Sequence, residues 1–106
     1  MTKAKSDKAG GKTAADLPTE TLSAGGREIS IRGLTRKEIR KMSTDGLNPG
    51  QVTLARSEEA MDHVLGRVLG KADLDFLDDQ LNAESIRVYR RILDLTYGRA
   101  DEEKNS

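Results

Sequence analysis

Polar and apolar residues alternate near the start of the chain, and further on the apolar positions recur at helical spacing. Residues 27–32 alternate strictly, with Ile29 and Ile31 on one face. Residues 19–23 alternate more weakly, and a pair of glycines lies between the two runs. This pattern predicts a short β-hairpin. Because an isolated hairpin is barely stable in water, we expect its isoleucine face to pack on helices.

A helix-start motif follows the predicted hairpin. Thr35 and Glu38 have the spacing of a capping box, in which the Thr hydroxyl accepts from the Glu amide and the Glu carboxylate accepts from the Thr amide. The motif predicts a short helix over residues 36–43. Leu34, just before the cap, is expected to pack on Ile39 as a hydrophobic staple.

The next stretch is rich in turn-forming residues and predicts a loop from residue 45 onwards. Its apolar residues, Leu47, Val52 and Leu54, are expected to touch the edge of the core. The loop is expected to run to about Arg56, where a new helical pattern begins.

The strongest periodic pattern in the chain begins at Ser57. This serine and the two glutamates after it predict a helix start with Ser57 as the N-cap. Gly70 fits the end of this helix. Between them the apolar residues repeat at the spacing of one helix face: Ala60, Met61, Val64, Leu65, Val68 and Leu69.

Two more helices are predicted in the last third of the chain. Asp73 is expected to cap a short helix, and Asn82 a longer one over about residues 83–97 that ends at Gly98. The chain is thus expected to be mainly α with a short N-terminal β-hairpin (α+β), in a small domain of about four helices. The longer helix should pack on two sides, because its apolar residues cover more than one stripe: Ile86, Val88, Tyr89, Ile92, Leu93, Leu95 and Tyr97.

The two ends of the 106-residue chain differ from its middle in composition. Residues 1–16 have no large apolar side chain after Met1 and carry a net charge of +2, so we expect a disordered tail. Residues 99–106 form a second polar tail, which leaves 17–98 as a single hairpin-plus-helices domain. A domain of this size is marginally stable alone, which favours a surface for a partner or for self-association.

Composition excludes several classes of protein. The chain has no cysteine, which excludes disulfides, thiolate metal sites and a cysteine nucleophile. No apolar run is long enough to span a membrane, and the basic start is not followed by the apolar segment of a secretory signal. We therefore expect a cytoplasmic protein.

The residues that usually carry out catalysis are few and poorly placed for it. The single histidine, His63, lies beside the apolar stripe of its predicted helix, and Asp62 faces another direction. The acidic residues over 73–84 match an EF-hand loop only in part, because Leu77 and Asp78 stand where the loop needs an oxygen ligand and a glycine. We expect a solvated His63, no enzymatic activity, no metal and no cofactor.

The net charge of zero conceals blocks of opposite sign. Residues 27–41 carry a net +4, residues 57–84 a net −6 and residues 85–99 a net +3. The first block suggests a small nucleic-acid-binding regulatory protein. The acidic middle and the lack of interleaved aromatic residues for base stacking weaken that interpretation. The alternative is that oppositely charged faces steer a protein partner or a second copy.

The order of these features resembles a known family. Ile29, Ile31, Leu34, Thr35 and Glu38 fit the pattern I-x-I-x-x-L-T-x-x-E, and helices follow. This is similar to the small tail assembly chaperones of long-tailed bacteriophages and prophages, and the resemblance covers nearly the whole predicted domain. It implies a non-enzymatic role in virion morphogenesis. In that role the protein binds the tape measure protein and helps to recruit tail tube subunits in the bacterial host cytoplasm.

A tape measure protein exposes apolar helix faces before assembly, and a helical module with a wide apolar stripe can cover such a face. The alternative is that this stripe is ordinary core. We expect the candidate contacts on two predicted helices: Met61, Val64, Leu65 and Val68 on one, and Ile86, Tyr89, Leu93 and Tyr97 on the other.

Overall fold

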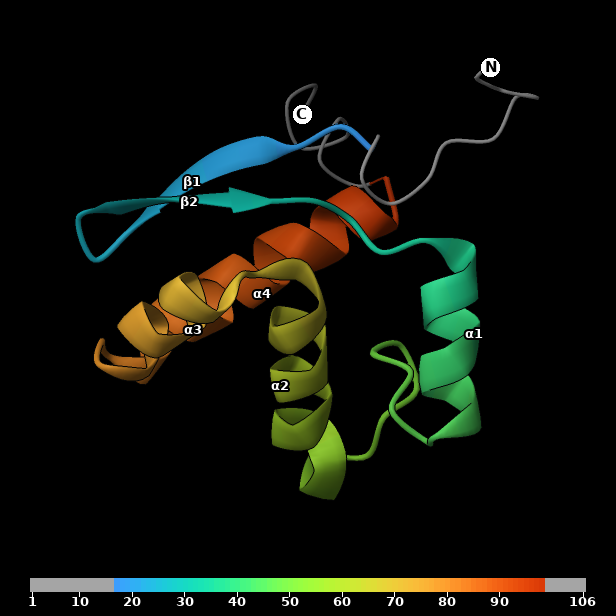
Figure 1. Ribbon diagram of the computed structural model, residues 1–106. Coiled ribbons are helices and arrows are strands. Elements are labelled where there is room, and N and C mark those ends of the chain that lie inside the picture. Colours follow the sequence, from blue (N-terminus) through green and yellow to red (C-terminus); the bar gives the residue numbers. More distant parts are fainter. Residues whose placement is uncertain (1–16, 99–106) are drawn as a thin grey trace, which may run out of the picture.

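The computed structural model describes residues 17–98, which form a mainly helical unit with one two-stranded antiparallel sheet (Figure 1). The predicted fold class is confirmed within this part of the chain. The predicted tails over 1–16 and 99–106 lie outside the described residues. The elements in chain order are β1 (Glu20–Ala24), β2 (Arg27–Ile31), α1 (Arg36–Thr44), the 3-10 turn η2 (Leu54–Arg56), α2 (Ser57–Val68), α3 (Lys71–Asp78) and α4 (Asn82–Thr96).

The hairpin follows the predicted alternation. β1 and β2 pair in antiparallel register, with Leu22 opposite Ile29. Gly25 and Gly26 form the turn with φ angles of 60° and 85°. Positive φ at both central positions is the requirement of a type I′ turn, which glycine meets without steric cost. The glycine pair therefore sets the register that turns the isoleucines of β2 toward the helices.

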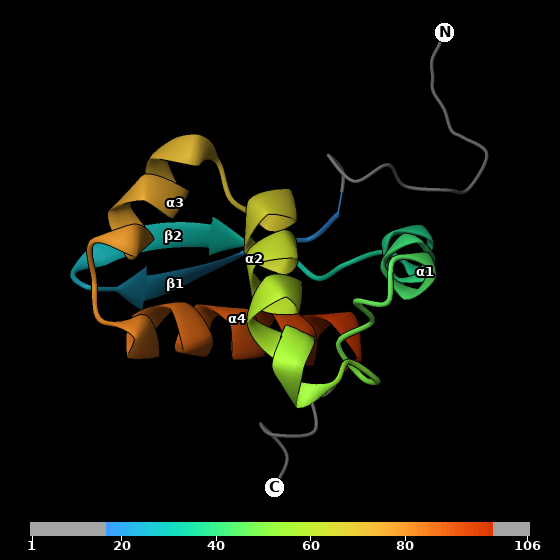
Figure 2. The same cartoon turned by 90° about the horizontal axis from the view of Figure 1, so that it is seen from below.

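The hairpin lies across one side of the molecule, with helices beneath it (Figures 1 and 2). α4 runs next to β1, and α3 lies next to β2. α2 lies further from the hairpin than α3 and α4, and its axis is at a steep angle to that of α4. α1 lies at the end of the molecule away from the hairpin turn. The expectation that the isoleucine face packs on helices is confirmed, since Ile29 and Ile31 are buried.

The hairpin and the helices share one continuous core. Its buried apolar residues come from β1, β2, every α-helix and the segments next to them, and the largest fully buried side chains are Ile29, Ile31, Met42, Val64, Val88 and Ile92. Leu47 is buried and Val52 is half-buried at its edge, as predicted. Leu54 is 92% exposed, so its predicted contact with the core is wrong. It lies on η2, a turn of 3-10 helix that the sequence pattern did not predict.

Glu38 is the one charged side chain buried among residues 17–98, at 8% exposure. Arg32, just beyond the end of β2, donates to both of its carboxylate oxygens at 2.9 and 3.0 Å. Arg67 on α2 donates to Oε2 at 2.8 Å. The Thr35 amide donates to Oε1, which completes the predicted capping box. The bonds from Arg32, followed by those from Thr35 and Arg67, outweigh the cost of burial and lower the pKa of Glu38 to about 2.

The end of α4 is joined to the chain between β2 and α1. The Thr96 hydroxyl accepts from the Leu34 amide at 2.8 Å and donates to the Ile92 carbonyl. The backbone approaches so closely here that a Cβ on Gly33 would lie 2.9 Å from the Thr96 nitrogen. Gly33 is therefore needed for close packing and not for an unusual backbone angle.

Three predicted N-caps are wrong. α2 starts at Ser57, but the Ser57 hydroxyl donates to the Leu54 carbonyl, because η2 leads directly into the helix. α3 begins at Lys71 after Gly70, which places Asp73 inside its first turn, where its carboxylate accepts from Arg27 at 2.8 Å. α4 likewise starts at Asn82, with no side-chain cap.

Candidate interaction groove on helix α4

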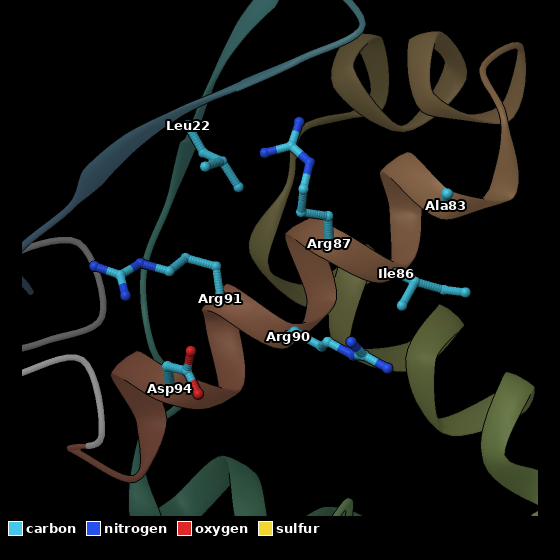
Figure 3. A pocket seen from close by; sticks show the side chains of 7 residues that line it. All are labelled: Leu22, Ala83, Ile86, Arg87, Arg90, Arg91 and Asp94. Carbon is cyan, nitrogen blue, oxygen red and sulfur yellow. The ribbon is translucent and has the colours of Figure 1, made fainter. Parts of the chain in front are cut away.

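A shallow groove of about 480 Å³ lies along α4 and continues onto β1 (Figure 3). Leu22, Ala83 and Ile86 give it a mainly apolar surface. Its charged lining residues are Arg87, Arg90, Arg91 and Asp94, all on α4. The groove is therefore an apolar surface with a basic border, on a helix that also supplies core residues.

Hydrogen bonds along α4 hold the hairpin in place beside the groove. The Gly25 amide donates to Glu84, and the Arg87 guanidinium donates to the Ser23 carbonyl. The Arg91 guanidinium donates to both carboxylate oxygens of Glu20. These bonds come from positions 84, 87 and 91, which share one helix face because α-helical neighbours are three or four residues apart. They fix β1 so that Leu22 projects toward α4 (Figure 3).

Two of the three arginines in the groove are already paired. Arg87 donates to Glu84 at 2.8 Å, and this bond is the main cause of the lowered pKa of Glu84. Arg91 is paired with Glu20. Arg90 is exposed, and within the described part of the chain it has no ion pair or side-chain hydrogen bond. In Figure 3 its side chain and that of Ile86 leave α4 on the same side, away from Leu22.

The structure separates the eight predicted contact residues into three groups. Met61, Val64 and Leu65 are buried in the core of the single chain. Tyr97 is 44% exposed just after α4. The half-buried group comprises Val68, Ile86, Tyr89 and Leu93. Ile86 alone of the eight lines the groove on α4, and burial raises the pKa of the Tyr89 hydroxyl. Their contact with a partner stays a prediction.

A second hollow, of about 490 Å³, lies between α2, α3 and the start of α4. Its apolar lining includes Met61 and Leu65, so two of the predicted contact residues form part of its floor. Its border carries Lys71 and four acidic side chains, Glu58, Asp62, Asp75 and Asp78. This hollow and the groove on α4 thus differ in sign of charge, as the charge blocks of the sequence suggested.

The basic block over 27–41 does not form one surface. Arg27 at the start of β2 is paired with Asp73 and lies over the Phe76 ring, 5.4 Å from its centroid. Arg32 is paired with Glu38. The remaining cations, all exposed on α1, are Arg36, Lys37, Arg40 and Lys41. The cationic surface from this block is therefore confined to α1.

The structure does not bring His63 and the acidic residues over 73–84 together into a catalytic or metal-binding site. His63 is half-buried on α2, so it is less exposed than expected. Residues 73–78 are helical, which is incompatible with the backbone of an EF-hand loop. Within residues 17–98, no cluster of three His, Cys, Asp or Glu side chains is arranged to hold a metal ion. None of the helices described is both long and apolar enough to cross a bilayer.

Sequence periodicity identified Ile86 but missed the rest of the groove. Leu22 comes from a strand and lies more than sixty positions earlier in the chain. The +3 block over 85–99 shows in the sequence that Arg87, Arg90 and Arg91 are grouped. The sequence does not show that these arginines lie beside the apolar side chains of the groove. No family model, curated protein or solved structure matches the chain.

Proposed function

We propose that this chain is a non-enzymatic tail assembly chaperone of a bacteriophage or prophage, acting in the cytoplasm of the bacterial host. In this role it binds a helical segment of the tape measure protein and helps to recruit tail tube subunits. The observation that carries the proposal is the open apolar groove on α4, because it offers side-chain contacts to another polypeptide. The pattern of Ile29, Ile31, Leu34, Thr35 and Glu38 supplies the link to the chaperone family.

The groove suits a helix more than an extended strand. It follows the axis of α4 from Ala83 to Asp94, a distance of about 16 Å at 1.5 Å per residue. A partner helix of about three turns covers that length and can place one apolar residue per turn against Leu22 and Ile86. Binding would remove these partly exposed side chains from water, which is favourable by about 25 cal/mol per Å² of apolar surface.

The experiment is co-expression with the tape measure protein of the same phage, followed by purification through a tag on this chain. We expect the tape measure protein to be recovered in soluble form with the wild-type chain. Ala83→Trp should abolish the recovery, because Ala83 is exposed and a bulky side chain there fills the groove without disturbing the core. Leu54→Asp is the matched control, since Leu54 is exposed on η2 and does not line the groove. Equal recovery with Ala83→Trp and Leu54→Asp would exclude the groove as the binding site.

A second function, nucleic-acid binding, is favoured by one observation. Four exposed cations stand close together on α1, namely Arg36, Lys37, Arg40 and Lys41. If they contact phosphates, binding to duplex DNA should weaken steeply with salt, because each neutralised phosphate releases counterions. An Arg36→Glu, Arg40→Glu double variant should then lose binding. No electrophoretic shift of duplex or single-stranded DNA at low salt would exclude this function.

A further inference from the structure

The groove on α4 contains a feature that its apolar surface does not explain, an arginine without a partner among residues 17–98. We infer that the groove selects an acidic amphipathic helix and that Arg90 recognises a carboxylate on that helix. This selectivity rests on the proposed function, because it defines the chemistry of the segment that the same groove binds.

The groove presents one positive charge to a partner. Glu84 neutralises Arg87 within α4, and Glu20 on β1 neutralises Arg91. Glu84 and Arg87 also make separate hydrogen bonds to the backbone of the hairpin at Gly25 and Ser23. Arg90 has no such role among the described residues, yet it lies within the lining of the groove. A guanidinium that is not used for folding remains available for recognition, and it attracts a negatively charged group.

That charge lies next to an apolar side chain. Ile86 and Arg90 are four residues apart on α4 and extend to the same side of it (Figure 3). A partner helix that packs an apolar residue on Ile86 can therefore place a residue one turn away against Arg90. Arg binds a carboxylate through two parallel hydrogen bonds, so Glu or Asp at that position gives both attraction and a defined register. Lys or Arg there would be repelled.

The groove fits a peptide better than a nucleic acid. A DNA backbone needs several cations at phosphate spacing, whereas the described lining of the groove contains one cation that is unpaired within residues 17–98, and an acidic residue, Asp94. Its other lining residues, Leu22, Ala83 and Ile86, include no aromatic ring on which a base could stack. The combination of a single cation with an apolar surface fits an acidic helix.

The test uses two designed helical peptides of about 18 residues, or about five turns. Both carry the same stripe of Leu and Ala; one has Glu and the other has Lys on the flanking positions. Binding to the full chain is measured by fluorescence anisotropy at low and high salt. We expect the Glu peptide to bind about tenfold more tightly than the Lys peptide, with the difference reduced at high salt.

Variants of the chain assign the preference to Arg90. Arg90→Glu should reverse the order of the two peptides, and Arg90→Gln should make their affinities similar. Arg40→Glu is the control, because Arg40 is an exposed arginine on α1 with a free side chain among the described residues, and it should leave the preference for the Glu peptide intact. Thermal midpoints of all three variants should match the wild type, since neither arginine is used in the fold.

Several outcomes would overturn the inference. These are equal binding of the two peptides, no binding of the Glu peptide, an unchanged preference in Arg90→Glu, or displacement of the Glu peptide by a duplex DNA fragment. Failure of the proposed function looks different: the Glu peptide would bind with the expected selectivity, but the tape measure protein would not be recovered with the chain. Recovery of the tape measure protein with no peptide selectivity would overturn only the role of Arg90.

Discussion

At the scale of single residues, Glu38 connects three separate parts of the chain. Its carboxylate accepts from Arg32 beyond β2, from the Thr35 amide and from Arg67 on α2. A buried carboxylate is costly to desolvate, and that cost is offset only when its oxygens are fully hydrogen-bonded. Both oxygens of Glu38 have two donors, so the geometry meets this condition.

The depressed pKa of Glu38 predicts a specific loss of stability in acid. The pKa of Glu38 is about 2 in the folded chain and lies near its ordinary value of 4.5 in the unfolded chain. The unfolded state therefore binds this proton more readily, so the stabilisation is complete above about pH 4.5 and is lost as the pH falls toward 2. Its size is on the order of 3 kcal/mol. Urea unfolding between about pH 6 and pH 2 measures the loss, and a flat profile would contradict it.

Substitution of Glu38 isolates its share of that effect. Glu38→Gln should lower the free energy of unfolding at neutral pH by about 2–4 kcal/mol, because it leaves Arg32 without its charged partner in a largely buried site. It should also flatten the acid profile relative to the wild type. Glu59→Gln is the matched control, since the Glu59–Arg56 pair is exposed and should leave the thermal midpoint nearly unchanged. Equal effects of the two substitutions would show that the Glu38 network is not stabilising.

At the scale of elements, the contact between the end of α4 and the segment after β2 depends on Gly33. Gly33→Ala would bring a methyl group within about 3 Å of the Thr96 and Leu95 backbone, which cannot move without disturbing α4. We expect a loss of about 1–3 kcal/mol in the free energy of unfolding, measured by chemical denaturation.

Gly66→Ala is the control for this substitution. Gly66 lies within α2, and a Cβ there has no neighbour within 4 Å. Because alanine favours a helix more than glycine does, this variant should be more stable by about 0.5–1 kcal/mol. If Gly33→Ala were as stable as Gly66→Ala, the close packing of α4 on this segment would be wrong.

The elements themselves were largely predictable from the sequence, but their start points were not. The Gly pair and the alternation predicted the hairpin, and the reciprocal motif of Thr35 and Glu38 predicted the start of α1. The prediction of Ser57 and Asp73 as N-caps was wrong. A capping hydrogen bond contributes only about 1 kcal/mol, so it does not form when the side chain bonds to another partner. Ser57 donates to the end of η2, and Asp73 accepts from Arg27. These partners depend on tertiary structure that a local pattern does not contain.

At the scale of the whole molecule, the net charge of zero is distributed over distinct surfaces. The groove on α4 has a basic border, and the hollow between α2 and α3 has an acidic one. The charge blocks of the sequence predicted that the two signs separate, but not which cations stay unpaired. Arg90 and Arg91 are neighbours in the sequence, yet only Arg91 reaches Glu20. That difference follows from the placement of β1 and is absent from any local pattern.

Residues 17–98 should be sufficient for folding and for binding. All the buried apolar residues among those described lie between Ala24 and Ile92, and the lining residues of the groove lie between Leu22 and Asp94. A chain reduced to residues 17–98 should therefore keep its thermal midpoint and its preference for the Glu peptide. A loss of 1 kcal/mol corresponds to a shift of about 4–8 °C in a domain of this size, so calorimetry resolves even a modest contribution from the removed ends. A midpoint lowered by that amount would show that residues 1–16 or 99–106 contribute to the fold, and separate deletions would identify which. An unchanged midpoint with lost peptide selectivity would instead place part of the recognition site in the removed ends.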